Sequence, residues 1–239
     1  MKSNRFWISI IILILGFWCF NHHELDSEYN RPIRGDAKGY YAFLPAIFIY
    51  QDLSYDFVDE MEMKYYPQDG SFAKAFRMKQ PNGTVVNKCF PGTSIFYLPF
   101  FLLALLFSWM VGIPVDGYSI LFQWSIAAAH LFYLFWGLLL LGKSLKINGV
   151  ANHRIVISLV LVVFATNVFY YSVYDFSVPH IFGFFGSCTM IYLVTKYKQS
   201  YRWKFIGWTI PLLALLVLTR PTNGMLIIVF PLILSWKEL

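Results

Sequence analysis

The stretch FWISIIILILGFWCF, residues 6–20, decides the fold class of this chain. It contains no charged residue, and Lys2 and Arg5 stand before it. A basic flank followed by an apolar run resembles a secretory signal peptide, but residues 17–20 lack the small side chains of a cleavage site. We therefore expect an uncleaved membrane anchor whose basic flank keeps the N-terminus in the cytoplasm.

The composition of the whole chain indicates the same class. Hydrophobic residues make up 58% and charged residues 13%, whereas soluble domains have about 25% charged residues. The 20% aromatic content suits a protein that lines two membrane interfaces. The net charge of +6 lies in short loops and not on one basic face, so no nucleic-acid partner is expected. The spacing of Cys19, Cys89 and Cys188 matches no metal or redox motif.

The topology follows from charge. Apolar runs occur at residues 6–20, 94–112, 118–142, 155–171, 181–195, 205–219 and 224–236. Two short loops carry seven basic residues and no acid, which predicts that both are cytoplasmic. These residues are Lys143, Lys146 and Arg154 in one loop and Lys196, Lys198, Arg202 and Lys204 in the other. The loops at 113–117 and 172–180 contain Asp116 and Asp175 without a basic residue and are predicted to lie outside.

The run 94–112 conflicts with this topology if it crosses the membrane once, because both basic loops would then lie outside. The conflict disappears if the run does not cross, because it lies in the membrane interface or dips in and returns. Pro91-Gly92 and Pro99 are compatible with a broken or re-entrant element. The alternative is an ordinary spanning helix with inverted topology. The non-crossing interpretation predicts an all-α integral membrane fold with about six transmembrane helices. Residues 1–239 then form one transmembrane module in which 21–117 is an extracytoplasmic loop with juxtamembrane helices.

The motif GDAKGYYAFLP, residues 35–45, is the most suggestive part of the long loop. Its Asp36 precedes an apolar, aromatic stretch. An aspartate there can cap a helix by accepting hydrogen bonds from free backbone N–H groups. It can also present a carboxylate at the membrane surface, and the two roles are compatible.

A second acid, Asp175, stands in YYSVYDFSVPH, residues 170–180, close to two expected helix ends. A charge in that place is costly unless it lies at the interface or has a function. His180 follows at the start of the next run. Asp175 can equally be an ordinary acid at the membrane interface, and His180 an ordinary histidine at a helix start. The predicted topology puts Asp36 and Asp175 on the same face.

Two cations complete the candidate groups on that face. Arg220 lies in TRPTNG, residues 219–224, and its guanidinium fork suits a phosphate. It can also simply snorkel to lipid headgroups. Lys88 lies beside the Pro91-Gly92 turn and can assist phosphate binding.

These residues resemble the GT-C membrane glycosyltransferases, which include dolichyl-phosphate-mannose protein mannosyltransferases and bacterial ArnT-like enzymes. The chain looks closest to Bacteroidetes-type members. The likeness rests on GDAKGYYAFLPAIF (35–48), NKCFPGTSIFYLPFF (87–101) and LTRPTN (218–223). Members of the family usually run longer, so the chain is expected to be the N-terminal part of such an enzyme and to be incomplete at its C-terminus.

The resemblance implies a glycosyltransferase of the cell envelope, a multi-pass protein of the bacterial inner (cytoplasmic) membrane. Its donor would be a polyprenyl-phosphate-linked sugar, and its acceptor a glycan, lipid or protein on the extracytoplasmic face. Asp36 and Asp175 would be catalytic, with a divalent cation between such acids in some members. Arg220, Lys88, His180 and Tyr40 would bind substrate.

Other classes of protein stay open at this stage. The chain can be a non-catalytic membrane subunit, a transport scaffold or an inactive truncated remnant. Transporters usually carry polar groups at the bilayer midplane. Here the middles of the apolar runs are almost uncharged, which favours chemistry at the membrane surface over permeation.

Overall fold

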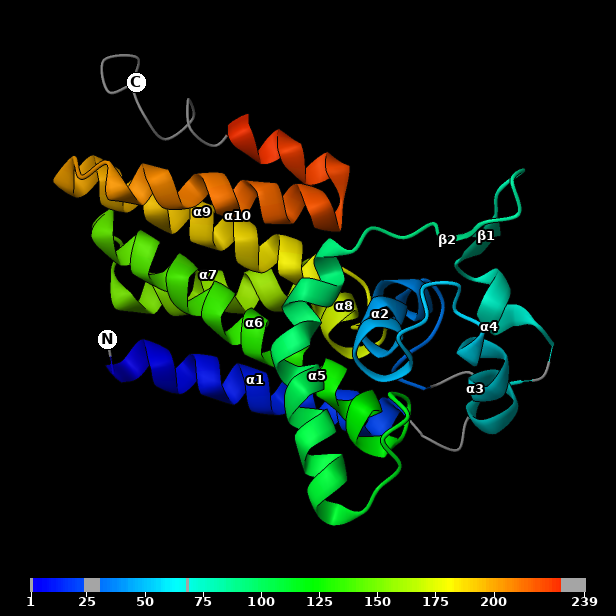
Figure 1. The fold of residues 1–239 in the computed structure, drawn as a ribbon. Helices are drawn as coiled ribbons and strands as arrows, with labels where there is room; N and C mark the ends of the chain where they lie inside the picture. Colours follow the sequence, from blue (N-terminus) through cyan, green and yellow to red (C-terminus); the bar gives the residue numbers. More distant parts are fainter. Residues whose placement is uncertain (1, 24–30, 68, 229–239) are drawn as a thin grey trace. The chain divides into compact units, whose positions relative to one another are not determined.

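The computed structural model describes residues 2–23, 31–67 and 69–228, and most of them are helical (Figure 1). The chain divides into two compact units. The bundle unit comprises Met1–Trp18, His130–Asp175 and Pro179–Leu239. The loop unit comprises Cys19–Ala129 and Phe176–Val178, and so contains the whole 21–117 segment.

The elements follow one another in a simple order along the chain. They are α1 (Lys2–His22), α2 (Ala37–Pro45), the π-helix η1 (Ala46–Tyr50), α3 (Phe57–Tyr65), α4 (Ser71–Lys74), β1 (Arg77–Lys79), β2 (Val85–Asn87), α5 (Gly92–Val111), α6 (Ile120–Ile147), α7 (Asn152–Phe164), α8 (Asn167–Val173), α9 (His180–Ser200), α10 (Lys204–Thr219) and the 3₁₀ helix η2 (Pro221–Ile228). The two short strands form an antiparallel hairpin in which Met78 lies opposite Val86.

Three helices in the described part of the chain are long and apolar enough to cross a membrane: α1 from Asn4, α5 and α6. The pair α7 and α8 gives a fourth if it is one span, although the two helices meet at 64°. The predicted count of six is therefore not confirmed. With 16 residues, α10 is short for a span, and most of the 224–236 run lies outside the described residues.

The run 94–112 forms one continuous helix, α5, which begins at Gly92 and ends before Gly112. Pro99 stands inside it without breaking it, because a proline removes a single N–H donor and neighbouring groups can compensate. The broken form of this element, with which Pro99 is compatible, is therefore not observed. Its 20 residues and apolar composition suit a spanning helix. That 94–112 does not cross the membrane remains a prediction.

The core of the bundle unit is aliphatic. Ile8 and Leu15 of α1, Leu138 of α6 and Leu159 of α7 are at most 1% exposed and pack in one cluster. Other faces of the same helices carry large exposed apolar side chains such as Leu13. Apolar side chains that remain exposed on these helices suit contact with lipid chains. Figure 1 shows α9 and α10 running alongside one another in this unit.

The bend between α7 and α8 has a local cause. Thr166 takes extended backbone dihedral angles and caps α8, because its hydroxyl oxygen accepts a hydrogen bond from the Val168 N–H at 3.2 Å. The same hydroxyl donates to the Val162 carbonyl at 2.6 Å. A threonine that satisfies the end of one helix and the start of the next allows the axis to turn.

The loop unit is built around buried aromatic rings. Tyr41 of α2 contacts the rings of Phe101 of α5 and Tyr118, and its hydroxyl donates to the Gly117 carbonyl at 2.6 Å. Gly117 has a φ of +81°, and a Cβ there would lie 2.8 Å from Pro45 Cβ. Glycine is therefore required at this turn, which fixes α2 against the segment that leads into α6.

Candidate functional site

The first candidate group forms around the start of α2. Gly35 has a φ of +52°, which turns the chain into the helix. Asp36 then has helical dihedral angles, φ −65° and ψ −21°, and its carbonyl accepts from the Gly39 N–H at 3.1 Å. Its side chain makes no capping hydrogen bond. A capping residue normally takes extended angles, so Asp36 has the position of an N-cap while its carboxylate lies exposed.

The segment after β2 lies directly against this first turn of α2. The Asn87 side-chain amide donates to the Gly39 carbonyl at 2.8 Å. A Cβ at Gly39 would lie 2.6 Å from Phe76 Cβ, so the close approach requires a glycine. The Lys88 N–H donates to the Phe76 carbonyl at 3.0 Å. Residues from three separate stretches thus hold the backbone around Asp36.

The charges of Asp36 and Lys88 act on a common neighbour, Cys89. Burial raises the pKa of the Cys89 thiol to about 11; the Asp36 carboxylate contributes to the rise, and the Lys88 ammonium opposes it. The thiol is therefore protonated at neutral pH and is a poor nucleophile. Asp36 and Lys88 thus both influence the pKa of one thiol, and their action in a common site remains a prediction. The Tyr40 carbonyl, four residues after Asp36, accepts a hydrogen bond from the Ser94 hydroxyl.

The second candidate group lies in the bundle unit, at the start of α9. The His180 ring stacks on the Tyr171 ring, with 3.7 Å between centroids and 18° between planes. Arg220 Nη1 lies 3.3 Å from His180 Nδ1 and 3.2 Å from Nε2. Because arginine is always protonated and only donates, an unprotonated ring nitrogen must accept. His180 and Tyr171 also line a pocket of about 340 Å³ with Thr166 and Asn167.

The LTRPTN stretch positions Arg220. Helix α10 ends at Thr219, before Pro221, as the sequence predicted. The Asn223 side-chain amide donates to the Leu216 carbonyl at 3.0 Å and to the Thr219 hydroxyl at 3.0 Å. The same carbonyl also accepts from the Arg220 N–H at 3.1 Å, so Asn223 adds a further hydrogen bond to the end of the helix. The sequence analysis did not predict this capping role of Asn223.

Asp175 lies in the turn between α8 and α9. It is half-buried, and its N–H donates to the Tyr170 carbonyl at 3.2 Å. It belongs to the bundle unit with His180 and Arg220, whereas Asp36, Tyr40 and Lys88 belong to the loop unit. The six predicted residues are therefore divided between the two units, three in each. Within residues 2–23, 31–67 and 69–228, no three His, Cys, Asp or Glu side chains form a group that could hold a metal ion.

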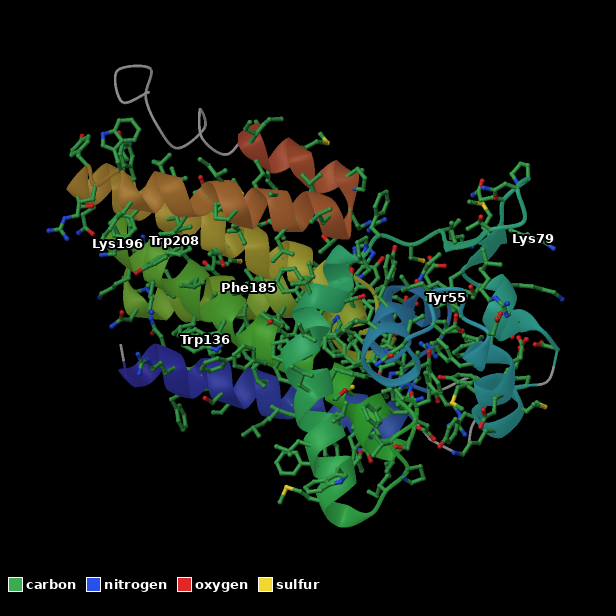
Figure 2. The ribbon with its side chains drawn as sticks, in the orientation of Figure 1. Tyr55, Lys79, Trp136, Phe185, Lys196 and Trp208 are labelled. Atoms are coloured by element: carbon green, nitrogen blue, oxygen red, sulfur yellow. The ribbon has the colours of Figure 1, made fainter. Side chains whose placement is uncertain are left out.

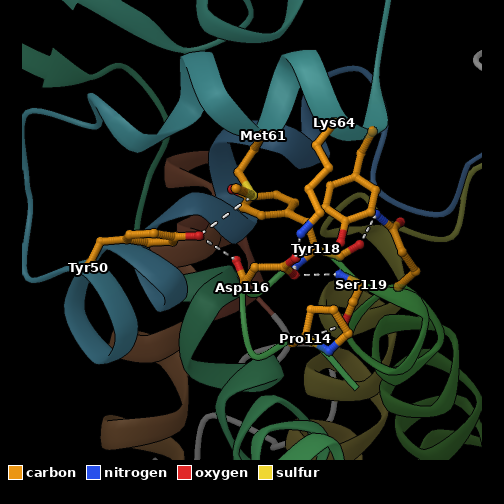
Figure 3. Close-up of polar contacts among 9 residues, drawn as sticks. Tyr50, Met61, Lys64, Pro114, Asp116, Tyr118 and Ser119 are labelled. Atoms are coloured by element: carbon orange, nitrogen blue, oxygen red, sulfur yellow. Dashed lines mark hydrogen bonds and ion pairs between the residues drawn. The ribbon is translucent and has the colours of Figure 1, made fainter. Parts of the chain in front are cut away.

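The structure adds a carboxylate site that the sequence analysis missed, at Asp116 (Figure 3). Asp116 Oδ2 accepts from Lys64 Nζ at 2.7 Å and from the Tyr65 hydroxyl. Asp116 Oδ1 accepts from the N–H groups of Tyr118 and Ser119 at 2.9 and 2.8 Å. Burial acts to raise the pKa of Asp116, but these hydrogen bonds outweigh it and lower that pKa. A carboxylate with four donors is already satisfied, so we assign Asp116 a structural role.

Lys38 is a second residue that the sequence analysis did not select. It stands inside the GDAKGYY motif and is only 8% exposed. Its ammonium lies 4.9 Å from the centroid of the Tyr66 ring and 5.0 Å from that of Phe72, and cations bind favourably over such ring faces. Burial lowers the pKa of Lys38, while the Glu62 and Asp69 carboxylates oppose that shift. Lys38 thus ties the motif to α3 and α4.

The described part of the chain is mostly helical and holds three helices that could cross a membrane. One candidate group lies at the start of α2, and the other lies where α9 begins and α10 ends. No family model, curated protein or solved structure matches the chain.

Proposed function

We propose that this chain transfers a sugar from a polyprenyl-phosphate donor to an acceptor hydroxyl on the extracytoplasmic face, with Asp36 as the general base. The observation that carries the proposal is the state of the Asp36 carboxylate. It is exposed and not used for capping, while the backbone beneath it is fixed by the Asn87 contact and the close packing at Gly39. A side chain held by rigid surroundings but available to solvent suits a base that meets a substrate.

The proposed step is a single displacement. Asp36 takes the proton of the acceptor hydroxyl as that oxygen attacks the anomeric carbon of the donor sugar. The bond between this carbon and the phosphate oxygen breaks, and its electron pair leaves with the polyprenyl phosphate. General base catalysis of this kind typically contributes a factor of about 10²–10⁴.

The leaving phosphate needs positive charge, and Lys88, which belongs to the same unit as Asp36, can supply it. Lys88 is exposed, belongs to the loop unit with Asp36 and, like Asp36, influences the pKa of Cys89. Arg220, in the bundle unit, is exposed and contacts a ring nitrogen of His180, which carries no charge when it accepts this hydrogen bond. The charge of Arg220 is then not opposed by this partner, and its fork can bind two phosphate oxygens.

The lipid tail of the donor requires an apolar surface beside the site. Helix α5 begins four residues after Lys88 and exposes large apolar side chains along its length. They include Ile95, Leu102, Leu103 and Leu106, each between 43% and 50% exposed. A phosphate bound near Lys88 would therefore have an apolar helix next to it for the polyprenyl chain.

The test uses the full chain reconstituted in liposomes with radiolabelled polyprenyl-phosphate hexose and pentose donors. Release of polyprenyl phosphate is expected to depend on an added acceptor and to fall about 10²- to 10⁴-fold in Asp36→Asn. Asp59→Asn is the matched control, because Asp59 is an exposed acid of the same unit, paired only at the surface with Arg77. Full activity of Asp36→Asn would refute the assignment of the base. No turnover of either donor by the wild-type chain would refute the donor class.

A further inference from the structure

A basic pocket of about 320 Å³ opens in the bundle unit, at the end where α1 and α7 begin and α6 and α9 end. Figure 2 shows Lys196 at this end of α9. The polar side chains that line the pocket come from all four helices and are Asn4, Arg5, Lys143, Lys146, Asn152, Tyr192 and Lys196. None of these residues belongs to the candidate groups around Asp36 and Arg220.

The charge of this pocket is uniformly positive, because four of its residues are cations and none is an acid. In the part of the chain that the structure describes, no carboxylate forms an ion pair with any of the four. Lys146 Nζ contacts the neutral Asn152 Oδ1 at 3.1 Å, and Lys143 Nζ lies 5.8 Å from the Tyr192 ring centroid. Two helices begin here and two end, so their dipoles largely offset one another. The four cationic side chains therefore determine the electrostatic potential in the pocket.

A buried acceptor without a partner belongs to Asn4, one of the residues that line the same pocket. Asn4 is 8% exposed, and its Oδ1 has no hydrogen-bond partner among the described residues. A buried polar atom of this kind is costly unless a donor reaches it. The four cations favour the binding of an anion. The Asn4 Oδ1 atom favours a ligand that also has a hydroxyl or ammonium donor close to that anion.

The walls of the pocket are apolar below this polar rim. Ile8 of α1 and Leu139 of α6 line it, and both helices are long and apolar enough to cross a membrane. A pocket with a basic rim and apolar walls between such helices matches an amphipathic ligand better than a free ion. Basic pockets between membrane helices bind anionic lipid headgroups.

We propose that this pocket binds the headgroup of an anionic glycerophospholipid of the phosphatidylglycerol type. The phosphate lies among Arg5, Lys143 and Lys196, a glycerol hydroxyl donates to Asn4 Oδ1, and the acyl chains follow the apolar walls. The proposal is independent of the proposed glycosyl transfer, because it involves other residues and no chemical step. Inorganic phosphate carries the same kind of negative charge as the lipid headgroup. The experiment below distinguishes binding of the lipid from binding of free phosphate.

Native mass spectrometry of the full chain in a delipidating detergent measures this binding directly. Dioleoyl-phosphatidylglycerol is titrated against dioleoyl-phosphatidylcholine, and the wild-type chain should retain the former preferentially. Each basic residue contributes roughly fivefold to binding of an anionic lipid. The double variant Lys143→Gln/Lys196→Gln should therefore bind phosphatidylglycerol about 25-fold more weakly.

The matched control is Arg202→Gln/Lys204→Gln, which removes the same charge from exposed residues outside the pocket. It should bind like the wild type. Equal loss in both double variants would show diffuse attraction and overturn the proposal, as would no loss in either. Asn4→Leu should lower the preference for phosphatidylglycerol over dioleoyl-phosphatidic acid, which lacks the glycerol hydroxyls. If millimolar inorganic phosphate displaces phosphatidylglycerol, the pocket is a free-anion site and the lipid assignment is wrong.

Discussion

Lys64 Nζ of α3 lies 2.7 Å from Asp116 Oδ2, and this ion pair joins two parts of the loop unit that are 52 residues apart. The Asp116 side chain is 11% exposed. Asp116→Asn keeps the shape of the side chain but removes the negative charge to which Lys64 and Tyr65 bind. We expect a loss of about 2–3 kcal/mol in the free energy of unfolding, seen as a melting temperature lower by about 5–10 °C in detergent.

The control for this variant is Asp56→Asn. Asp56 also forms an ion pair, with Arg77 at 3.0 Å, but its side chain is 75% exposed. Exposed pairs contribute little, so its melting temperature should stay within about 2 °C of the wild type. Equal effects of the two substitutions would contradict the structural role assigned to Asp116.

The same carboxylate predicts a dependence of stability on pH. The pKa of Asp116 is lower in the folded chain than its ordinary value. Its contribution is therefore complete above the unfolded pKa of about 3.9 and is lost as the pH falls through the folded value. Melting temperatures measured between pH 7 and pH 3 should fall less steeply below about pH 4 in Asp116→Asn than in the wild type. Parallel curves of melting temperature against pH for the two proteins would contradict the lowered pKa of Asp116.

Gly39→Ala tests the packing beneath Asp36. The added Cβ would lie 2.6 Å from Phe76 Cβ, so α2 or the segment around Phe76 must move, at a cost of about 1–3 kcal/mol. The control is Gly207→Ala in α10, where a Cβ meets nothing within 4 Å. Alanine favours the helix there and should leave the melting temperature unchanged or raise it slightly. A tolerated Gly39→Ala would show that the backbone around Asp36 is not fixed by this contact.

The topology prediction is tested by reporters fused at three positions. A fusion at Asn148 should report the cytoplasm, because its loop carries Lys143, Lys146 and Arg154. Fusions at Asn82 and Val115 flank α5 and should both report the outside if 94–112 does not cross. Opposite signals from Asn82 and Val115 would show that α5 is a spanning helix, and an outside signal at Asn148 would invert the whole arrangement.

Prolines and glycines made part of the fold predictable. Pro91-Gly92 marks the start of α5, and Pro221 follows the end of α10, because both residues constrain the backbone locally. The number of spans was less predictable. Helix α9 is 21 residues long, yet it is not among the helices apolar enough to span, since its apolar run is interrupted by small and polar residues.

Long-range contacts explain most of what the sequence did not predict at the site. The Asp116 network depends on a partner 52 residues away, and the fixed backbone at Asp36 depends on Asn87, 48 residues beyond Gly39. Neither spacing leaves a periodic signal. The capping prediction for Asp36 was half right, because the sequence identified the helix start but not the helical dihedral angles that leave the carboxylate exposed.

The central claim is that the Asp36 carboxylate is the base of glycosyl transfer, and a single-turnover experiment tests it most directly. Wild-type, Asp36→Asn and Asp59→Asn chains are mixed in excess with a labelled polyprenyl-phosphate sugar and an acceptor, and the rate of transfer and the donor affinity are measured separately. The account predicts a transfer rate about 10²- to 10⁴-fold lower in Asp36→Asn alone, with donor affinity unchanged in all three. An unchanged rate in Asp36→Asn, or a loss confined to donor affinity, would contradict it.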